Sequence, residues 1–511
     1  MSKGMCSVLT KKQAVLLVPP ALLIILLFAL FGCAAAGNAQ KSASYDIVIY
    51  GGGFTGCAAA RSAAINAPDR SILLVVPDPE PVLGGIGTSG GQNYFDTWRW
   101  HGQLVAGGSF AHWYNQTGQF YNTGAMASLL RAELAEYKNI HILWTHDIEK
   151  VSTDGAPARI TGLELRDVFR DGAGVIRWGN DERRVTGRVF VDASEDGRLT
   201  RLAGVPVTTG RADWPAQYLD PAERNGGDTK RAPAPPAETA RQQAATLQFK
   251  ITGVTVPAGS ARVGDIYFTR SRHGVWGVDG GSLTFRDNPV VRAFNDHYAP
   301  LGFALKPFNA AQDGPDSREW WVNALLVFNV DGRADQRDRG TPAWPAVRPD
   351  GLDTDTAWVK ARDILDKPEF IQALRQFSVV DPRTGRRYGL ENAALVKDGQ
   401  GKPVVGDLLY LRETVHLPLN PAHNGNGTEN SNYALTPAAC QGAGGKMTVA
   451  GPGGRAASGQ ASPPGTDAAN YATRIGLGFY AMDINAYSHR DLKRQGVYGW
   501  PVTGRDRPDW R

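Results

Sequence analysis

Cysteine is scarce in this chain of 511 residues, which contains only Cys6, Cys33, Cys57 and Cys440. No two of them have the spacing of a zinc or iron–sulfur motif, so we expect no metal site. Four widely separated cysteines do not predict a disulfide framework either. Cys57 stands in an alanine-rich segment, and we expect it to be buried in a helix.

A strong excess of one charge is also lacking, because 55 Lys and Arg residues stand against 50 Asp and Glu residues, a formal net charge of +5. Basic residues occur only in short clusters such as Arg183-Arg184 and Arg386-Arg387. A nucleic-acid-binding domain presents a dense basic patch or stripe. We therefore expect no nucleic-acid partner.

Long apolar runs are missing except near the N-terminus, where lysines precede an apolar segment at 14–31 and small residues at 32–39. This order is typical of a secretory signal. Three outcomes stay open: lipidation of Cys33 in a lipoprotein-like box, cleavage near Ala39, or an uncleaved membrane anchor, since the run is almost long enough to span a bilayer. We expect residues 1–40 to direct export to the periplasm, the cell envelope or the medium.

The most informative motif is a glycine-rich turn between a strand and a helix. Residues 46–50 have strand character and the alanine-rich residues 57–64 have helix character. Between them, Gly51, Gly53 and Gly56 fit the G-x-G-x-x-G fingerprint of a dinucleotide-binding βαβ unit. The glycines permit a tight turn, close approach of backbone to a diphosphate, and close helix–sheet packing. The diphosphate would bind at the helix N-terminus, where the helix dipole favours an anion.

A second strand at 71–76 is expected to complete this unit. An acidic residue near the end of that strand usually binds the ribose hydroxyls, but the expected position holds Val76. Asp78 and Glu80 are the two candidates to replace it. The glycine-rich residues 83–91 follow at once and would let backbone run close to a large flat ligand, which favours FAD over NAD.

These residues resemble the FAD-dependent oxidoreductases of the glutathione-reductase-like flavoprotein fold, including a widespread bacterial and fungal group. The resemblance implies FAD as the cofactor and an α/β fold class, with a Rossmann-like FAD-binding domain around a central parallel sheet and an inserted antiparallel-sheet substrate domain. It is carried by blocks spread from Tyr45 to Asp483. These blocks are Gly51–Ala60, Leu83–Gly85, Thr88–Gly91, Asp192–Ala193, Leu199–Pro206, Leu411–Glu413 and Ile475–Asp483.

We expect four parts along the chain: 1–40, the signal or anchor; 41–205, the first part of the FAD-binding domain; 206–405, the substrate domain; and 406–511, the return to the FAD-binding domain. Within the substrate domain, strands are expected at 245–251 and 324–330 and a helix at 358–377. Similar proteins continue past the last matching block with a further strand–glycine–helix segment. We expect this chain to lack that segment.

The resemblance also implies which residues bind FAD. The fingerprint glycines would face the diphosphate, Leu83–Thr88 would line the flavin, Ile148 would give backbone contacts to adenine, and Asp192 would end a strand beside the nucleotide. The cofactor-binding candidates are Gly51, Gly52, Gly53, Phe54, Thr55, Gly56, Asp78, Gly84, Gly85, Thr88, Ile148 and Asp192.

The catalytic residues stay open. A flavin accepts the hydride or electrons itself, so the protein needs a cation or a helix N-terminus near the pyrimidine end of the ring, and for some substrates a base that takes a proton. Arg412 and His416 are the candidates, because residues four apart on a strand point the same way. An Arg–Glu pair and a surface histidine would explain them equally well. His101 and His112 are equally weak candidates for a catalytic residue.

Two other functions remain open beside an exported oxidoreductase acting on a small molecule. One is a non-catalytic flavoprotein-fold binding protein of the cell envelope. The other is an exported carbohydrate-active protein that uses an aromatic cluster as a stacking wall, although ordinary loop packing would account for the same cluster. Its members are Tyr94, Phe95, Trp98, Trp100, Trp113 and Tyr114.

Overall fold

The computed structural model describes residues 41–209 and 242–415, apart from gaps at 98, 101–102, 105, 157, 206, 208, 346–350 and 413. It also describes the short strands β18 (Thr448–Ala450) and β19 (Ala456–Ser458). By its contacts the chain divides into two units, Met1–Ser42 and Ala43–Arg511, and the site lies in the second. The expected export signal lies outside the described residues. Within them, no helix has both the length and the apolar character to cross a bilayer.

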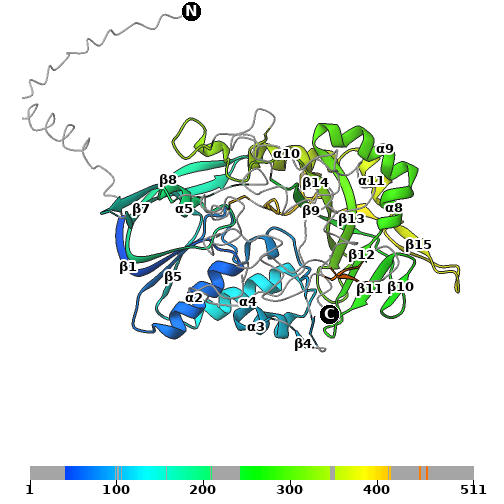
Figure 1. Ribbon diagram of the computed structural model, residues 1–511, viewed down its shortest axis with the longest axis horizontal. Coiled ribbons are helices and arrows are strands. Elements are labelled where there is room, and N and C mark those ends of the chain that lie inside the picture. Colours follow the sequence, from blue (N-terminus) through cyan, green and yellow to red (C-terminus); the bar gives the residue numbers. More distant parts are fainter. Residues whose placement is uncertain are drawn as a thin grey trace, which may run out of the picture. The chain divides into compact units, whose positions relative to one another are not determined.

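The first sheet has the strand order β5-β2-β1-β8-β7-β6 (Figure 1). Its parallel half consists of β1 (Lys41–Tyr50), β2 (Ile72–Val75) and β5 (Ile140–Leu143), with β2 in the middle. The last three residues of β1 and all of β2 are buried, as their β-branched, aliphatic and aromatic side chains predict. This half confirms the expected βαβ unit.

Helix α2 (Phe54–Asn66) connects β1 to β2 and packs on the sheet through small side chains. Its buried residues are Gly56, Cys57, Ala60 and Ala64, spaced to share one face of the helix. Cys57 is fully buried, as expected. Figure 1 shows α3 (Gly108–Thr117) and α4 (Thr123–Ala135) beside α2 on the same side of the sheet.

The other half of the first sheet is an antiparallel meander. It consists of β6 (His146–Asp154), β7 (Arg159–Arg170) and β8 (Ile176–Asp192), and β8 lies next to β1. The loop after β8 leads into the short helix α5 (Arg198–Leu202). The sheet is therefore mixed, with a parallel half that carries the glycine turn.

The second sheet is antiparallel, with the order β10-β11-β12-β13-β14-β9-β17. Its strands are β9 (Ala245–Thr252), β10 (Ala261–Val263), β11 (Ile266–Arg270), β12 (Trp276–Gly280), β13 (Phe303–Gln312), β14 (Trp320–Val327) and β17 (Ala394–Leu395). Together with the mixed first sheet, it confirms the expected fold class, α/β with an added antiparallel sheet.

Helices pack against the second sheet and share its apolar core (Figure 1). They are α8 (Ser282–Asp287), α9 (Pro289–Tyr298), α10 (Thr354–Leu365) and α11 (Pro368–Leu374). The single helix expected at 358–377 was wrong: Pro368 starts α11, because proline has no N–H to continue α10. The expected strand at 324–330 is also shifted, because β14 begins at Trp320 and ends at Val327.

Candidate functional site

The turn after β1 has little room for side chains at its first and last glycines. Gly51 has a φ of +117°, and a Cβ built on it would lie 2.6 Å from the carbonyl oxygen of Ala193. A Cβ on Gly56 would lie 1.8 Å from the carbonyl oxygen of Gly51. Neither position accepts a side chain without a shift of backbone. These two glycines are therefore explained by packing within the protein.

Gly53 is different, because a Cβ built on it meets no atom within 4 Å. Gly53 is the N-cap of α2, whose first turn has no acidic residue and no side-chain cap. The first N–H groups of a helix have no intrahelical acceptor, and the helix dipole makes this end positive. The end of α2 therefore faces open space in which an anionic group fits.

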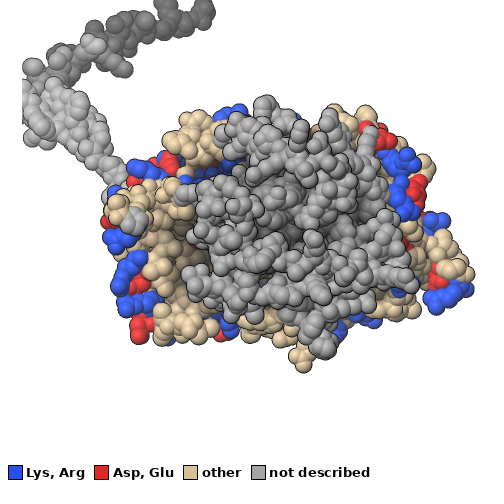
Figure 2. Space-filling view, in the orientation of Figure 1, with Lys and Arg blue, Asp and Glu red and all other residues tan. Residues whose placement is uncertain are grey.

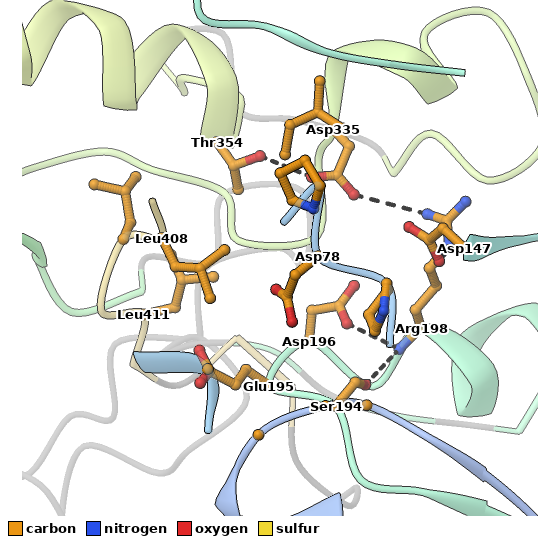
Figure 3. A pocket seen from close by; sticks show the side chains of 18 of the residues that line it. Asp78, Asp147, Ser194, Glu195, Asp196, Arg198, Asp335, Thr354, Leu408 and Leu411 are labelled. Atoms are coloured by element: carbon orange, nitrogen blue, oxygen red, sulfur yellow. Dashed lines mark hydrogen bonds and ion pairs between the residues drawn. The ribbon is translucent and has the colours of Figure 1, made fainter. Parts of the chain in front are cut away.

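That space is part of a cavity of about 160 Å³, shown in Figure 3. It lies at the carboxyl ends of β1 and β2, where ligands bind in open α/β sheets. Its lining includes residues from the glycine turn and from loops that follow β2 and β8. Further lining comes from the second half of the chain. Gly51, Gly52, Gly53, Asp78, Glu195, Asp335, Thr354 and Leu408 are among the residues that line it.

Carboxylates dominate the interior of this cavity. In Figure 3, Asp78, Glu195 and Asp196 point toward its centre. Burial, with the nearby charges of Asp147 and Asp407, raises the pKa of Asp78 to about 7. Burial likewise raises the pKa of Asp407 to about 6, against the opposing effect of Arg170. Carboxyl oxygens accept hydrogen bonds from hydroxyl groups, so this part of the cavity suits a ribose.

A buried ion network forms one wall of the cavity. Arg198 is 1% exposed; its Nε lies 3.2 Å from Asp147 Oδ1, and its guanidinium also binds Asp338. Arg337 binds the other oxygen of Asp147, and Tyr50 donates a hydrogen bond of 2.6 Å to Asp147. Burial would raise the pKa of Asp147, but the two arginines hold it below its usual value. The network ties β6 and α5 to the turn η6 (Gln336–Asp338).

Five of the predicted cofactor-binding residues line the cavity, namely Gly51, Gly52, Gly53, Asp78 and Gly85. Of the two acids proposed to replace the usual ribose-binding residue, Asp78 lies in the cavity, whereas Glu80 is exposed and does not line it.

Other predicted residues support the turn from outside the cavity lining. Gly84 donates its N–H to the Gly52 carbonyl oxygen, at 2.8 Å. The Thr88 hydroxyl donates to the Leu83 carbonyl oxygen, at 2.6 Å. Phe54 packs its ring against other aromatic rings, and Thr55 is exposed. These residues shape the segment rather than line the cavity.

Ile148 does not take the place expected of it, whereas Asp192 ends a strand, β8, as the resemblance implies. The Ile148 carbonyl oxygen accepts two hydrogen bonds from Arg198, at 3.0 and 2.7 Å, and its N–H donates to Asp147. Ile148 therefore has no free backbone group for adenine, which corrects that expectation. Asp192 accepts hydrogen bonds from Ser194 and Thr200, so its carboxylate holds the loop after β8 in place.

The catalytic candidates are not brought together among the described residues. Arg412 lies in no strand; it donates to the Ala244 carbonyl oxygen and the Thr246 hydroxyl, and its guanidinium covers the Tyr410 ring. This corrects the expected strand placement. His416 and His101 lie outside the described residues. His112 is on α3 with 45% of its side chain exposed, 3.1 Å from Glu133.

The aromatic cluster, where the structure describes it, is a packed core. The Phe95 ring contacts Phe54, Phe110 and Tyr121, and the Trp113 Nε1–H donates to Glu133. The side chains of Trp98 and Trp100 lie outside the described residues. The described members favour the loop-packing interpretation over a stacking wall.

A polar row crosses the second sheet and was not predicted. Asn309, Asn323 and Gln248 are directly opposed on β13, β14 and β9, so their side chains share one face. The amide groups of Asn323 and Gln248 both donate to Gln92, which follows the glycine-rich segment. One buried oxygen on each of the three, and the Trp321 Nε1, have no partner among the described residues. Buried polar groups are nearly always paired, so water or a ligand is expected there.

Glu195, Asp196 and Arg198 were also missed as site residues. The sequence held a signal for them, because the β-branched and aromatic residues 189–191 run into the small and acidic residues 192–197. Such residues follow the carboxyl end of a strand next to β1, the edge at which ligands bind.

Comparison with known proteins assigns the chain to a protein family. A family model described as "FAD dependent oxidoreductase" matches residues 46–418. Among solved structures, a myxobacterial chondrochloren halogenase, a variant of FAD-dependent halogenases, is similar at 14% identity; the alignment covers 73% of this chain and 64% of the halogenase, with a TM-score of 0.31. A geranylgeranyl bacteriochlorophyll reductase-like protein from Thermoplasma acidophilum shows 14% identity, coverage of 66% and 79%, and a TM-score of 0.28. No curated protein matches.

Proposed function

Because this chain belongs to the FAD-dependent oxidoreductases, we propose that it is an exported enzyme that transfers a hydride or electrons from a small-molecule substrate to bound FAD. The family assignment makes it an FAD-dependent oxidoreductase. The proposal goes beyond the family assignment in two respects, export and the nature of the substrate.

The observation that carries the assignment of the site is the open space in front of Gly53. The residues around it fit the ADP half of FAD. The N-terminus of α2 would bind the diphosphate through N–H groups, and Asp78 would accept hydrogen bonds from ribose hydroxyls. FAD, when bound, supplies the ring that accepts a hydride. The residues around this space would bind and orient the cofactor.

The polar row on the second sheet supports a polar substrate. Asn309, Asn323 and Gln248 face the segment that carries Gln92, directly after the glycine-rich residues 83–91. Their unpartnered oxygens accept hydrogen bonds, so a substrate with hydroxyl or N–H groups would satisfy them. The proposal is therefore that the substrate is recognised by the second sheet, which the resemblance assigns to the substrate domain.

The order of charged, apolar and small residues over 1–40 supports export. Lipidation at Cys33 would attach the protein to a membrane through its N-terminus, whereas cleavage near Ala39 would release it. Cell fractionation together with the intact mass of the mature protein separates these outcomes. A full-length mass in the cytosolic fraction would contradict export.

The direct test of the cofactor is to purify the full chain, record its absorbance spectrum, and identify the extracted cofactor by mass spectrometry. We expect a yellow protein that releases about one FAD per chain. A folded protein that stays colourless after incubation with FAD would contradict the proposal and favour a non-catalytic binding role.

A further inference from the structure

Glu195 lies beside the turn that is expected to bind the cofactor's diphosphate. It belongs to the loop after β8 and points into the cavity (Figure 3). Its Oε1 lies 3.8 Å from the position that a Cβ on Gly85 would take, and that same position is 3.2 Å from the Cα of Gly53. Glu195 therefore stands next to the one turn glycine that opens into free space.

The groups that face Glu195 leave its charge uncompensated. The Ile86 N–H donates a hydrogen bond to it, while Asp78 and Asp196 add negative charge. Asp196 has a partner of its own, Arg201, at 2.6 Å. No ion pair joins Glu195 to a lysine or arginine within the described part of the chain.

The other cations of the cavity are already engaged. Arg198 and Arg337 bind Asp147, Asp335 and Asp338. Arg170 donates to the carbonyl oxygens of Gly174 and Asp407. The remaining carboxylates of the cavity add more negative charge, so an anion that enters beside Glu195 meets a like charge without a free cation to offset it.

We propose that Glu195 couples the binding of FAD to the uptake of one proton: the diphosphate is accepted when the Glu195 carboxyl is protonated and is repelled when it is ionised. The proton comes from solvent when the cofactor binds and returns to solvent when it leaves. This inference rests on the proposed function, because it takes the cavity beside Gly53 as the diphosphate site.

The titration of Glu195 falls in a range that makes this coupling measurable. Burial and the charges of Asp78 and Asp196 raise the pKa of Glu195 to about 7. A nearby diphosphate raises that pKa further, since like charges disfavour ionisation. By linkage, affinity for FAD is constant well below pH 7 and falls by up to about tenfold per pH unit above it.

The test uses the FAD-loaded protein and measures the dissociation constant of FAD from flavin fluorescence between pH 6.5 and 8.5. Glu195→Gln keeps the size of the side chain and removes its charge. Asp78 and Asp407 titrate in both proteins, so the informative quantity is the ratio of the wild-type constant to the variant constant. We expect this ratio to rise by about 20-fold over that range.

Glu391→Gln serves as the matched control, because Glu391 is exposed and does not line the cavity. The ratio of the wild-type dissociation constant to the Glu391→Gln dissociation constant should not change with pH. Glu195→Ala is a second uncharged variant, should the glutamine variant fail to fold. A ratio that stays within twofold across the pH range for a folded uncharged variant overturns the inference while leaving the proposed function intact. Failure of every protein to retain FAD at any pH overturns both.

Discussion

At the scale of single residues, the three fingerprint glycines are required for different reasons. Gly51 and Gly56 are required by backbone atoms that lie 2.6 and 1.8 Å from where their Cβ atoms would be, whereas Gly53 has no such neighbour. The first two are thus needed for the fold and the third for the ligand. Substitutions at these positions should separate stability from cofactor binding.

Gly56→Ala should lower the free energy of unfolding by about 1–3 kcal/mol, because the added methyl group overpacks the contact between α2 and the turn. Chemical denaturation followed by circular dichroism measures this change. Gly124→Ala is the matched control: Gly124 is exposed in α4, its Cβ would meet only an atom at 3.4 Å, and alanine favours helix. Equal stability of the two variants would contradict the packing argument.

At the scale of elements, local signals predicted the elements of the parallel half well. The glycine turn, the alanine-rich helix and the two strands are each specified within a few residues, so α2 and β2 were found close to their true ends. The long helix expected at 358–377 failed because apolar periodicity continues across Pro368, while the backbone cannot.

The walls of the cavity were harder to predict, because they come from distant parts of the chain. Thr354, Leu408 and Glu195 are far apart in the sequence, yet all three line the cavity beside the glycine turn. Ile148 shows the same limit: the resemblance implied a backbone contact to adenine, but sequence reasoning did not predict that Arg198 binds its carbonyl oxygen. Sequence pattern fixes local conformation, whereas these contacts depend on tertiary packing.

At the scale of the whole second unit, the ion network around Arg198 joins the meander of the first sheet to η6 in the second half of the chain. Arg198→Met removes one partner from buried carboxylates and should lower the free energy of unfolding by about 3–5 kcal/mol. Arg188→Met is the control, because Arg188 is 71% exposed and its pair with Asp46 should contribute less than about 1 kcal/mol. Similar losses in the two variants would show that the network does not join the two halves.

We infer that the open space at Gly53 holds the diphosphate of FAD. The most direct measurement is the FAD content of purified Gly53→Asp beside Gly259→Asp, a glycine that is equally free of neighbours but lies outside the cavity. We expect Gly53→Asp to fold, with the circular dichroism spectrum of the wild type, and to retain less than about a tenth of the wild-type FAD, since the new carboxylate fills and charges the space. The control should keep its full content. Wild-type FAD content in folded Gly53→Asp would contradict the claim.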